Sequence, residues 1–154
     1  KDSKVLTARF DAALALLKKQ KQVDPEKIGV VGYCFGGGVA LGMARAGKDL
    51  DAVATFHASL KGQTTAEPGK VKPRILVQTG GADPMIPKEQ VEAFEKEMKD
   101  AGANVEVIVY PNAKHSFTNP DAAKAGMEPL AYDADADQKS WEQAMKLFAE
   151  VFES

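Results

Sequence analysis

The sequence predicts an α/β protein in which a mostly parallel sheet lies between two layers of helices. Two observations carry this prediction. Stretches with apolar residues at helical spacing alternate with short, uniformly apolar stretches, and one segment, residues 28–41, has the pattern of strand, sharp turn and helix. Short strands without polar alternation are typical of sheets buried on both faces, so a three-layer α/β/α arrangement is expected.

The expected elements follow in chain order. Helices are predicted over residues 3–20, 34–46, 87–101 and 135–153, and buried strands over 28–31, 52–56, 74–79 and 105–110. The first helix would cover a sheet face with Val5, Phe10, Ala13, Leu14 and Leu17, and the last would bury Trp141, Met145, Phe148 and Phe152. Turns with Gly, Pro and Asp separate these elements, and the stretch 57–72 is predicted to be a loop.

The turn around the single cysteine has the form of a nucleophile elbow. Gly32 and Gly36 flank Cys34, which stands where the usual serine would be. Both glycines are expected to be needed because strand and helix pack too closely there for a Cβ. The sulfur would lie clear of the sheet, at a helix start where backbone N–H groups and the helix dipole favour a thiolate. A lone cysteine is otherwise a small buried hydrophobe, and that alternative stays open.

Two further reactive residues follow separate predicted strands. Asp83 comes after the third strand and His115 after the fourth, so both should meet Cys34 at the carboxyl ends of a parallel sheet. Nucleophile, carboxylate and imidazole in this chain order suit nucleophilic catalysis, with the imidazole as base and the carboxylate fixing its tautomer. The alternatives are a turn role for Asp83, since Asp-Pro is common in turns, and a surface-loop role for His115.

Composition excludes several classes of function. The 154 residues are 44% hydrophobic with a net charge of −2, which fits one ordinary core and offers no cationic surface for nucleic acid or an anionic membrane. No apolar run approaches the roughly 20 residues of a membrane span, and the first residues do not form a signal peptide, so a cytoplasmic protein is expected. One cysteine and two histidines predict neither a disulfide nor a structural zinc site.

A few residues have two interpretations. His57 ends a buried strand and could line a pocket or make a structural hydrogen bond. The run Asp133, Asp135, Asp137 suggests calcium at first sight, but it lacks the glycine and final glutamate of a calcium loop, so helix capping and solvated charge account for it better. Tyr33, Met85, Phe117 and Tyr132 could form a pocket wall or belong to the core.

Three motifs together resemble one family. They are Gly32-Tyr33-Cys34-Phe35-Gly36-Gly37, Gly80-Gly81-Ala82-Asp83-Pro84-Met85-Ile86-Pro87 and His115-Ser116-Phe117. Their order and spacing resemble the dienelactone hydrolase family, which carries a Cys-Asp-His triad on an α/β-hydrolase fold, and the resemblance runs from about Val5 to Phe152.

The resemblance implies a mechanism without a cofactor. Cys34 would attack a small ester or lactone and form an acyl thioester, and His115, oriented by Asp83, would act as base, then acid, and activate water. The backbone N–H of Phe35 would supply one oxyanion donor. Rival functions are a general carboxylesterase or thioesterase with the same triad, and a catalytically silent binding module.

Two departures from the family pattern shape the expectations. The second oxyanion donor of this fold comes from a loop after an early strand, and about a third of the usual domain would precede Lys1. The chain 1–154 is therefore expected to be a single domain that lacks the N-terminal strands, completed by an N-terminal segment or a separate chain. The archetypal enzyme also has an arginine shortly after the histidine, whereas Thr118-Asn119-Pro120 follows here, so dienelactone itself is not the expected substrate.

Overall fold

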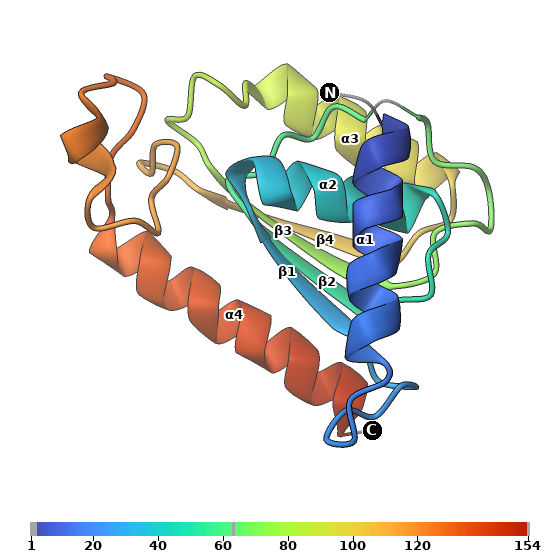
Figure 1. The fold of residues 1–154 in the computed structure, drawn as a ribbon. Helices are drawn as coiled ribbons and strands as arrows, with labels where there is room; N and C mark the ends of the chain where they lie inside the picture. The colour runs from blue at the N-terminus through green and yellow to red at the C-terminus, as the bar shows by residue number, and fades with distance from the viewer. Residues whose placement is uncertain (1–2, 63, 154) are drawn as a thin grey trace.

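The computed structural model describes residues 3–62 and 64–153, which form a four-stranded sheet with helices on both sides (Figure 1). The helices are α1 (Ser3–Leu17), α2 (Cys34–Arg45), α3 (Lys88–Asp100) and α4 (Ala134–Phe152), with a 3-10 turn η1 (Ala122–Ala125). The strands are β1 (Gly29–Tyr33), β2 (Ala52–Phe56), β3 (Arg74–Gly80) and β4 (Val105–Tyr110). The predicted α/β class and the order of the main elements are confirmed.

All neighbouring strands are parallel and follow the order β1-β2-β3-β4. Tyr33 of β1 is level with Phe56 of β2, which is level with Gln78 of β3. Helices α2 and α3 cover one face of the sheet and α4 covers the other (Figure 1). Because the strands are parallel, the loops that follow them all begin at the same end of the molecule.

The core has two parts, one on each face of the sheet. Beneath α2 and α3 it contains Leu41, Val53, Ile75, Val77 and Phe94, and beneath α4 it contains Phe56, Leu76, Tyr110, Phe117 and Leu147. Every residue of β2 is buried, as its uniformly apolar sequence predicts for a strand covered on both faces.

Helix α1 differs from the expectation. It ends at Leu17, and none of its described residues is fully buried. Phe10 and Leu14 pack against the core, whereas Val5 is 46% and Leu17 is 42% exposed. Since β1 is the edge strand of the described sheet, no further described strand lies beyond it for this helix to cover. Only part of the predicted apolar stripe therefore packs against the core.

The buried face of α4 also differs from the predicted one. Its buried residues are Ala136, Ser140, Ala144 and Leu147. Trp141 and Met145 are 47% and 40% exposed, although helical spacing predicted both in the core. The small residues allow the helix to approach the sheet closely, which leaves the larger side chains on its flanks. Phe148 belongs to that flank and lies against Gly29 of the edge strand.

The elbow is made by close backbone packing at Gly32 and Gly37. A Cβ on Gly32 would lie 2.6 Å from the Cα of Gly37, and one on Gly37 would lie 2.5 Å from the Cβ of Ala58. A Cβ on Gly36 would meet nothing within 4 Å, so the expectation that Gly36 is required by close packing is wrong. Gly37, rather than Gly36, shares this role with Gly32.

This difference predicts opposite effects for two similar substitutions. Gly32→Ala is expected to lower the free energy of unfolding by about 2 kcal/mol or more, because the obstructing atoms are backbone and cannot rotate away. Gly36→Ala, within α2, is expected to be neutral or to stabilise by up to about 1 kcal/mol, because alanine restricts the unfolded chain. Urea unfolding of both variants checks this, and equal losses would contradict it.

A buried ion pair connects α2 to α3. Arg45 is 3% exposed, and its Nε and Nη2 each lie 2.8 Å from a carboxylate oxygen of Glu97. Nη2 also donates to the carbonyl oxygen of Leu60, and the guanidinium lies over the ring of Phe94. This pair fixes the loop after β2 against both helices. Separately, none of the described helices is long and apolar enough to cross a membrane.

Candidate active site

Cys34 lies at the junction of β1 and α2. It is the first residue of α2 and has a φ of +49°, a conformation that L-residues other than glycine rarely adopt. The close packing at Gly32 and Gly37 imposes this sharp turn. Cys34 is exposed, as predicted for a nucleophile at the end of the sheet, and does not pack as a buried hydrophobe.

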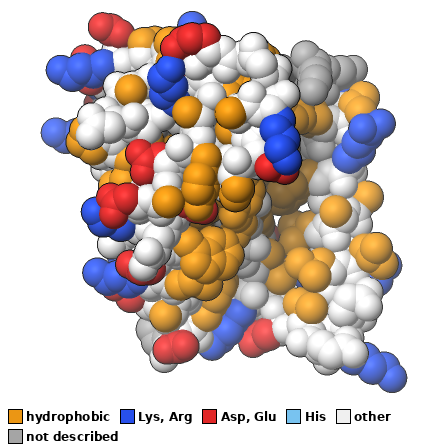
Figure 2. Space-filling model, turned by 90° about the vertical axis from the view of Figure 1, so that its left-hand side faces the viewer, with side chains coloured by type: hydrophobic (Ala, Val, Ile, Leu, Met, Phe, Trp, Pro, Cys, Tyr) orange, Lys and Arg blue, Asp and Glu red, His pale blue; other side chains and the backbone are white. Residues whose placement is uncertain are grey.

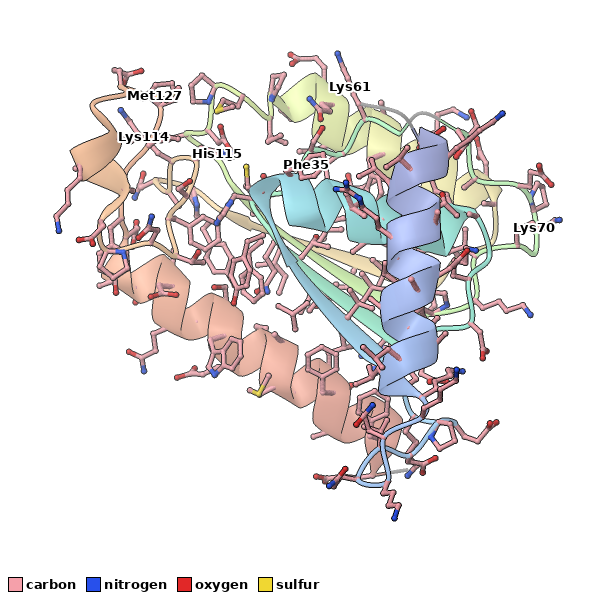
Figure 3. The ribbon with its side chains drawn as sticks, in the orientation of Figure 1. Phe35, Lys61, Lys70, Lys114, His115 and Met127 are labelled. Carbon is pink, nitrogen blue, oxygen red and sulfur yellow. The ribbon has the colours of Figure 1, made fainter. Side chains whose placement is uncertain are left out.

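His115 lies in the loop after β4, and its backbone is fixed on both sides. Its N–H donates to the carbonyl of Pro129 at 3.1 Å, and its own carbonyl accepts from the N–H of Ala131 at 3.2 Å. The next residue, Ser116, has a φ of +61°. His115 is 3% exposed and is not a solvated surface-loop residue. Figure 3 places it near Phe35, the first residue after the cysteine.

Asp83 follows β3 and is also 3% exposed. Its Oδ1 accepts from the backbone N–H of Met85 at 2.8 Å, and its Oδ2 lies 2.7 Å from Nδ1 of His115. Asp83 therefore makes a turn hydrogen bond and also brings its carboxylate to His115. The turn hydrogen bond orients the carboxylate, which leaves the other oxygen directed at the imidazole.

The three predicted residues form one chain of hydrogen bonds. Nε2 of His115 lies 3.2 Å from Sγ of Cys34, while its Nδ1 contacts Asp83. The hydrogen bond to Asp83 raises the pKa of His115; burial opposes this shift and Cys34 adds to it. The imidazole is therefore oriented to take the thiol proton and to hold it as an imidazolium.

A second histidine lies beside the first. His57 follows β2, is 3% exposed and has a φ of +40°. Its Nε2 lies 3.0 Å from Oγ1 of Thr118, and its ring centre lies 5.1 Å from that of His115, edge to face. Burial, and then the nearby His115, lower the pKa of His57 to about 4. The hydrogen-bonding alternative for His57 agrees with this placement. Its link to Thr118 was not predicted, because the two residues lie far apart in the sequence.

The low pKa of His57 predicts a loss of stability in acid. Between pH 6.5 and about 4, the unfolded chain binds a proton that the folded chain does not, so the free energy of unfolding falls as the pH falls. A shift of this size corresponds to about 3 kcal/mol at most. The raised pKa of His115 acts above pH 6.5, where the stability it contributes is lost as the pH rises.

Urea unfolding between pH 7 and pH 4 would measure this loss. Carboxyl groups in general also titrate near pH 4. The loss in the free energy of unfolding is therefore compared between the wild type and His57→Asn. The variant is expected to lose less stability than the wild type across this range. Equal losses in the two proteins would contradict the assignment of the acid sensitivity to His57.

The predicted pocket residues separate into two groups. Tyr33 and Met85 are 42% and 48% exposed, with Tyr33 at the carboxyl end of β1 and Met85 in the loop after β3, and Tyr132, just before α4, is 40% exposed. Phe117 is fully buried and contacts the rings of His57 and Tyr110, so it belongs to the core and not to a pocket wall. Figure 2 views the molecule from the left-hand side of Figure 1. It shows hydrophobic side chains gathered in the middle of this face, beside a hollow.

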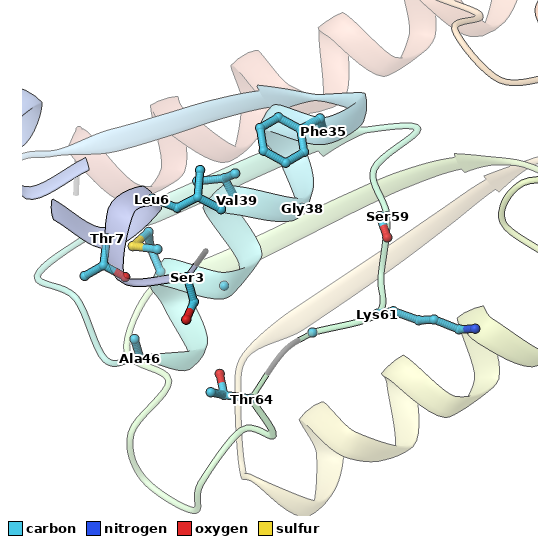
Figure 4. Close-up of a pocket in the computed structure, with 13 residues that line it drawn as sticks. Ser3, Leu6, Thr7, Phe35, Gly38, Val39, Ala46, Ser59, Lys61 and Thr64 are labelled. Atoms are coloured by element: carbon cyan, nitrogen blue, oxygen red, sulfur yellow. The ribbon is translucent and has the colours of Figure 1, made fainter. Parts of the chain in front are cut away.

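A hollow of about 280 Å³ lies between α1, α2 and the loop after β2 (Figure 4). Its walls include Leu6, Phe35, Val39, Met43 and Ser59. Cys34, Asp83 and His115 do not line this hollow, and Phe35 is the wall residue next to Cys34 in the sequence.

The described residues contain no cluster of His, Cys, Asp and Glu that could hold a metal ion. Asp133 caps α4, since its Oδ1 accepts from the N–H of Ala136, and Asp135 pairs with Lys139. Capping and solvated charge account for these two aspartates, as the sequence indicated.

Comparison with known proteins agrees with the fold. The model of the dienelactone hydrolase family matches residues 1–152. The chain belongs to the dienelactone hydrolase family. The crystal structure of a dienelactone hydrolase-like promiscuous phosphotriesterase from metagenomic libraries superposes with a TM-score of 0.92 at 37% identity, covering 97% of this chain and 63% of that one.

Curated relatives of this dienelactone hydrolase family member differ in length. An uncharacterized protein of Caenorhabditis elegans is 35% identical over 152 residues, which are 96% of this chain and 94% of the worm protein. A Yersinia pestis protein named "Putative carboxymethylenebutenolidase" is 28% identical over 82% of this chain and 48% of its own length. The chain thus spans about half the length of that bacterial relative and almost all of the worm protein.

Proposed function

We propose that the chain hydrolyses a small ester or lactone through an acyl thioester on Cys34. The observation that carries this proposal is the hydrogen-bonded chain from Sγ of Cys34 through His115 to Asp83. An exposed sulfur next to a buried, oriented imidazole is the arrangement that activates a thiol nucleophile.

The proposed steps use these three residues in turn. His115 takes the thiol proton at Nε2, and the thiolate attacks the carbonyl carbon to form a tetrahedral oxyanion. In this proposed mechanism the backbone N–H of Phe35, in the first turn of α2, donates to that oxyanion. The C–O bond then breaks, His115 returns the proton to the leaving alkoxide, and an acyl thioester stays on Cys34.

Hydrolysis of the thioester uses the same base. His115 takes a proton from a water molecule, the hydroxide adds to the thioester carbonyl, and the carboxylic acid leaves as the C–S bond breaks. Cys34 recovers its proton through Nε2. Asp83 holds Nδ1 in its protonated form throughout and stabilises the imidazolium.

We further propose that another polypeptide segment covers β1, either N-terminal to Lys1 or as a separate chain. The outer edge of β1 has no neighbouring strand among the described residues, and Val31 on this strand is 40% exposed. Exposed strand edges pair readily with added strands. A segment here would lie next to Cys34 and could supply a second oxyanion donor.

Amide hydrogen exchange tests this second proposal. In the isolated chain, the outward amides of residues 29–33 are expected to exchange fast. Adding the part of the phosphotriesterase chain that lies outside the 63% match is expected to slow them and to raise esterase activity. Unchanged exchange and activity would contradict the proposal.

Phosphotriesters are a second candidate class of substrate. The 37% identical relative with a TM-score of 0.92 is described as a promiscuous phosphotriesterase, and the same thiolate could attack phosphorus in place of carbon. Diethyl p-nitrophenyl phosphate is the matching probe. It is expected to release p-nitrophenol and leave a phosphorylated Cys34.

The decisive experiment is hydrolysis of p-nitrophenyl acetate with rapid acid quench and mass spectrometry. A burst of p-nitrophenol and a single acetyl adduct on the peptide that contains Cys34 are expected. A general carboxylesterase or thioesterase would give the same adduct but prefer other acyl groups in a panel of esters, thioesters and lactones. A folded protein with neither turnover nor adduct would be the catalytically silent module.

A further inference from the structure

We infer that His57 is a positioning residue for His115, held in place by its hydrogen bond to Thr118. The inference rests on the proposed role of His115 as the base of Cys34, and it assigns a function to a buried histidine outside the triad. A side-chain hydrogen bond connects the end of β2 to the histidine loop, with Nε2 of His57 3.0 Å from Oγ1 of Thr118.

The placement of His57 has a cost that core packing alone does not require. Its φ of +40° is uncommon for a residue with a side chain, although histidine tolerates it better than most. Its Nδ1 is buried and has no hydrogen-bond partner among residues 3–62 and 64–153. A buried apolar residue would avoid the cost of the buried Nδ1, so the imidazole has a use at this position that an apolar side chain would not serve.

The contacts of the ring indicate that use. The His57 ring lies edge to face with His115 at 5.1 Å between centres and with Phe117 at 5.3 Å. The hydrogen bond that Nδ1 of His115 donates to Asp83 holds the ring at one atom, but this bond alone leaves the ring free to tilt about it. Contact with His57 restricts that tilt and therefore keeps Nε2 directed at Sγ of Cys34.

Thr118 completes the arrangement. It lies three residues after His115 in the same loop, so the bond to His57 fixes the loop as well as the ring. The titratable groups around His57 are His115 and Asp83 on the loops after β4 and β3, and Tyr33 at the end of β1, whose ring centre is 6.1 Å away. Among these, His115 is the group whose orientation the proposed chemistry needs.

Alkylation of Cys34 by iodoacetamide tests the inference without any ester turnover. The chain has a single cysteine, so the mass increase reports on this thiol alone. Because the thiolate is the reacting form, the alkylation rate at pH 7 depends on how well His115 holds the proton taken from the thiol of Cys34. His57→Asn, which tolerates the positive φ, is expected to lower this rate and the esterase kcat by about tenfold with little change in KM.

A matched pair at Thr118 keeps the test valid if His57→Asn fails to fold. Thr118→Val removes the hydroxyl and is expected to reproduce the tenfold loss, whereas Thr118→Ser retains it and is expected to keep most of the wild-type rate. Tyr110→Phe is the control for a lost buried hydrogen bond, since it removes the bond to Gln78 without touching His115. It should lower Tm and leave alkylation unchanged.

Two results would overturn the inference. One is a loss of Tm in His57→Asn or Thr118→Val with a wild-type alkylation rate, which a purely structural role would give. The other is a loss in Thr118→Ser equal to that in Thr118→Val. If alkylation follows the expected order but wild-type protein hydrolyses no ester, the positioning role of His57 stands and the proposed hydrolase function fails.

Discussion

Cys34→Ala is expected to lower kcat for p-nitrophenyl acetate by at least about 10³-fold, because it removes the proposed nucleophile while leaving the fold intact. The acetyl adduct should disappear with the activity. Stopped-flow release of p-nitrophenol and intact mass measure both effects in the same sample.

Cys34→Ser is the matched variant for this experiment. It keeps a nucleophilic oxygen at the elbow, but a hydroxyl is much harder to deprotonate than a thiol, so its rate should lie well below wild type and above alanine. If Cys34→Ala hydrolyses the ester at the wild-type rate, Cys34 is not the nucleophile. Equal Tm values for the three proteins are required before the rates are compared.

The sequence was sufficient to predict the convergence of Cys34, Asp83 and His115. Each follows an apolar stretch that could only be a buried strand, and parallel strands end on the same side of a sheet. That inference needs only the order of the elements. The side chains then fall within hydrogen-bond distance because each loop is fixed by its own backbone hydrogen bonds.

Packing between elements could not be predicted in the same way. Helical spacing marks a stripe on α4 but does not say which side of that stripe faces the sheet, and the small residues at Ala136, Ser140 and Ala144 took the buried side while Trp141 remained half exposed. The same limit applies at the elbow, where Gly37 of α2 packs against Ala58 in the loop after β2. Such contacts depend on distances between elements that no local pattern contains.

Polar contacts across long sequence separations were also beyond local reasoning. Arg45 pairs with Glu97 and His57 with Thr118, and each pair joins two loops or helices that only the fold brings together. A cue existed for His57, since a histidine directly after a buried strand at the functional end of the sheet requires a partner. The cue does not identify that partner.

Asp83→Asn is expected to lower kcat by about 10³-fold to 10⁴-fold with little change in KM. The hydrogen bond from the N–H of Met85 to Oδ1 fixes how an amide would sit, with its oxygen toward Met85 and its NH₂ toward Nδ1 of His115. Two donors would then face each other unless the imidazole moves its proton to Nε2. In that tautomer Nε2 is no longer free to accept the thiol proton of Cys34.

The chain offers a matched control in Asp24→Asn. Asp24 also precedes a proline, and its Oδ1 also accepts the N–H two residues later, from Glu26 at 3.0 Å, but on the exposed surface away from His115. This variant should keep full activity, whereas Asp83→Asn should also lose the main cause of the raised pKa of His115, which NMR titration of the imidazole would detect as a fall. If both variants retain wild-type kcat, Asp83 is a turn residue and the proposed triad lacks its carboxylate.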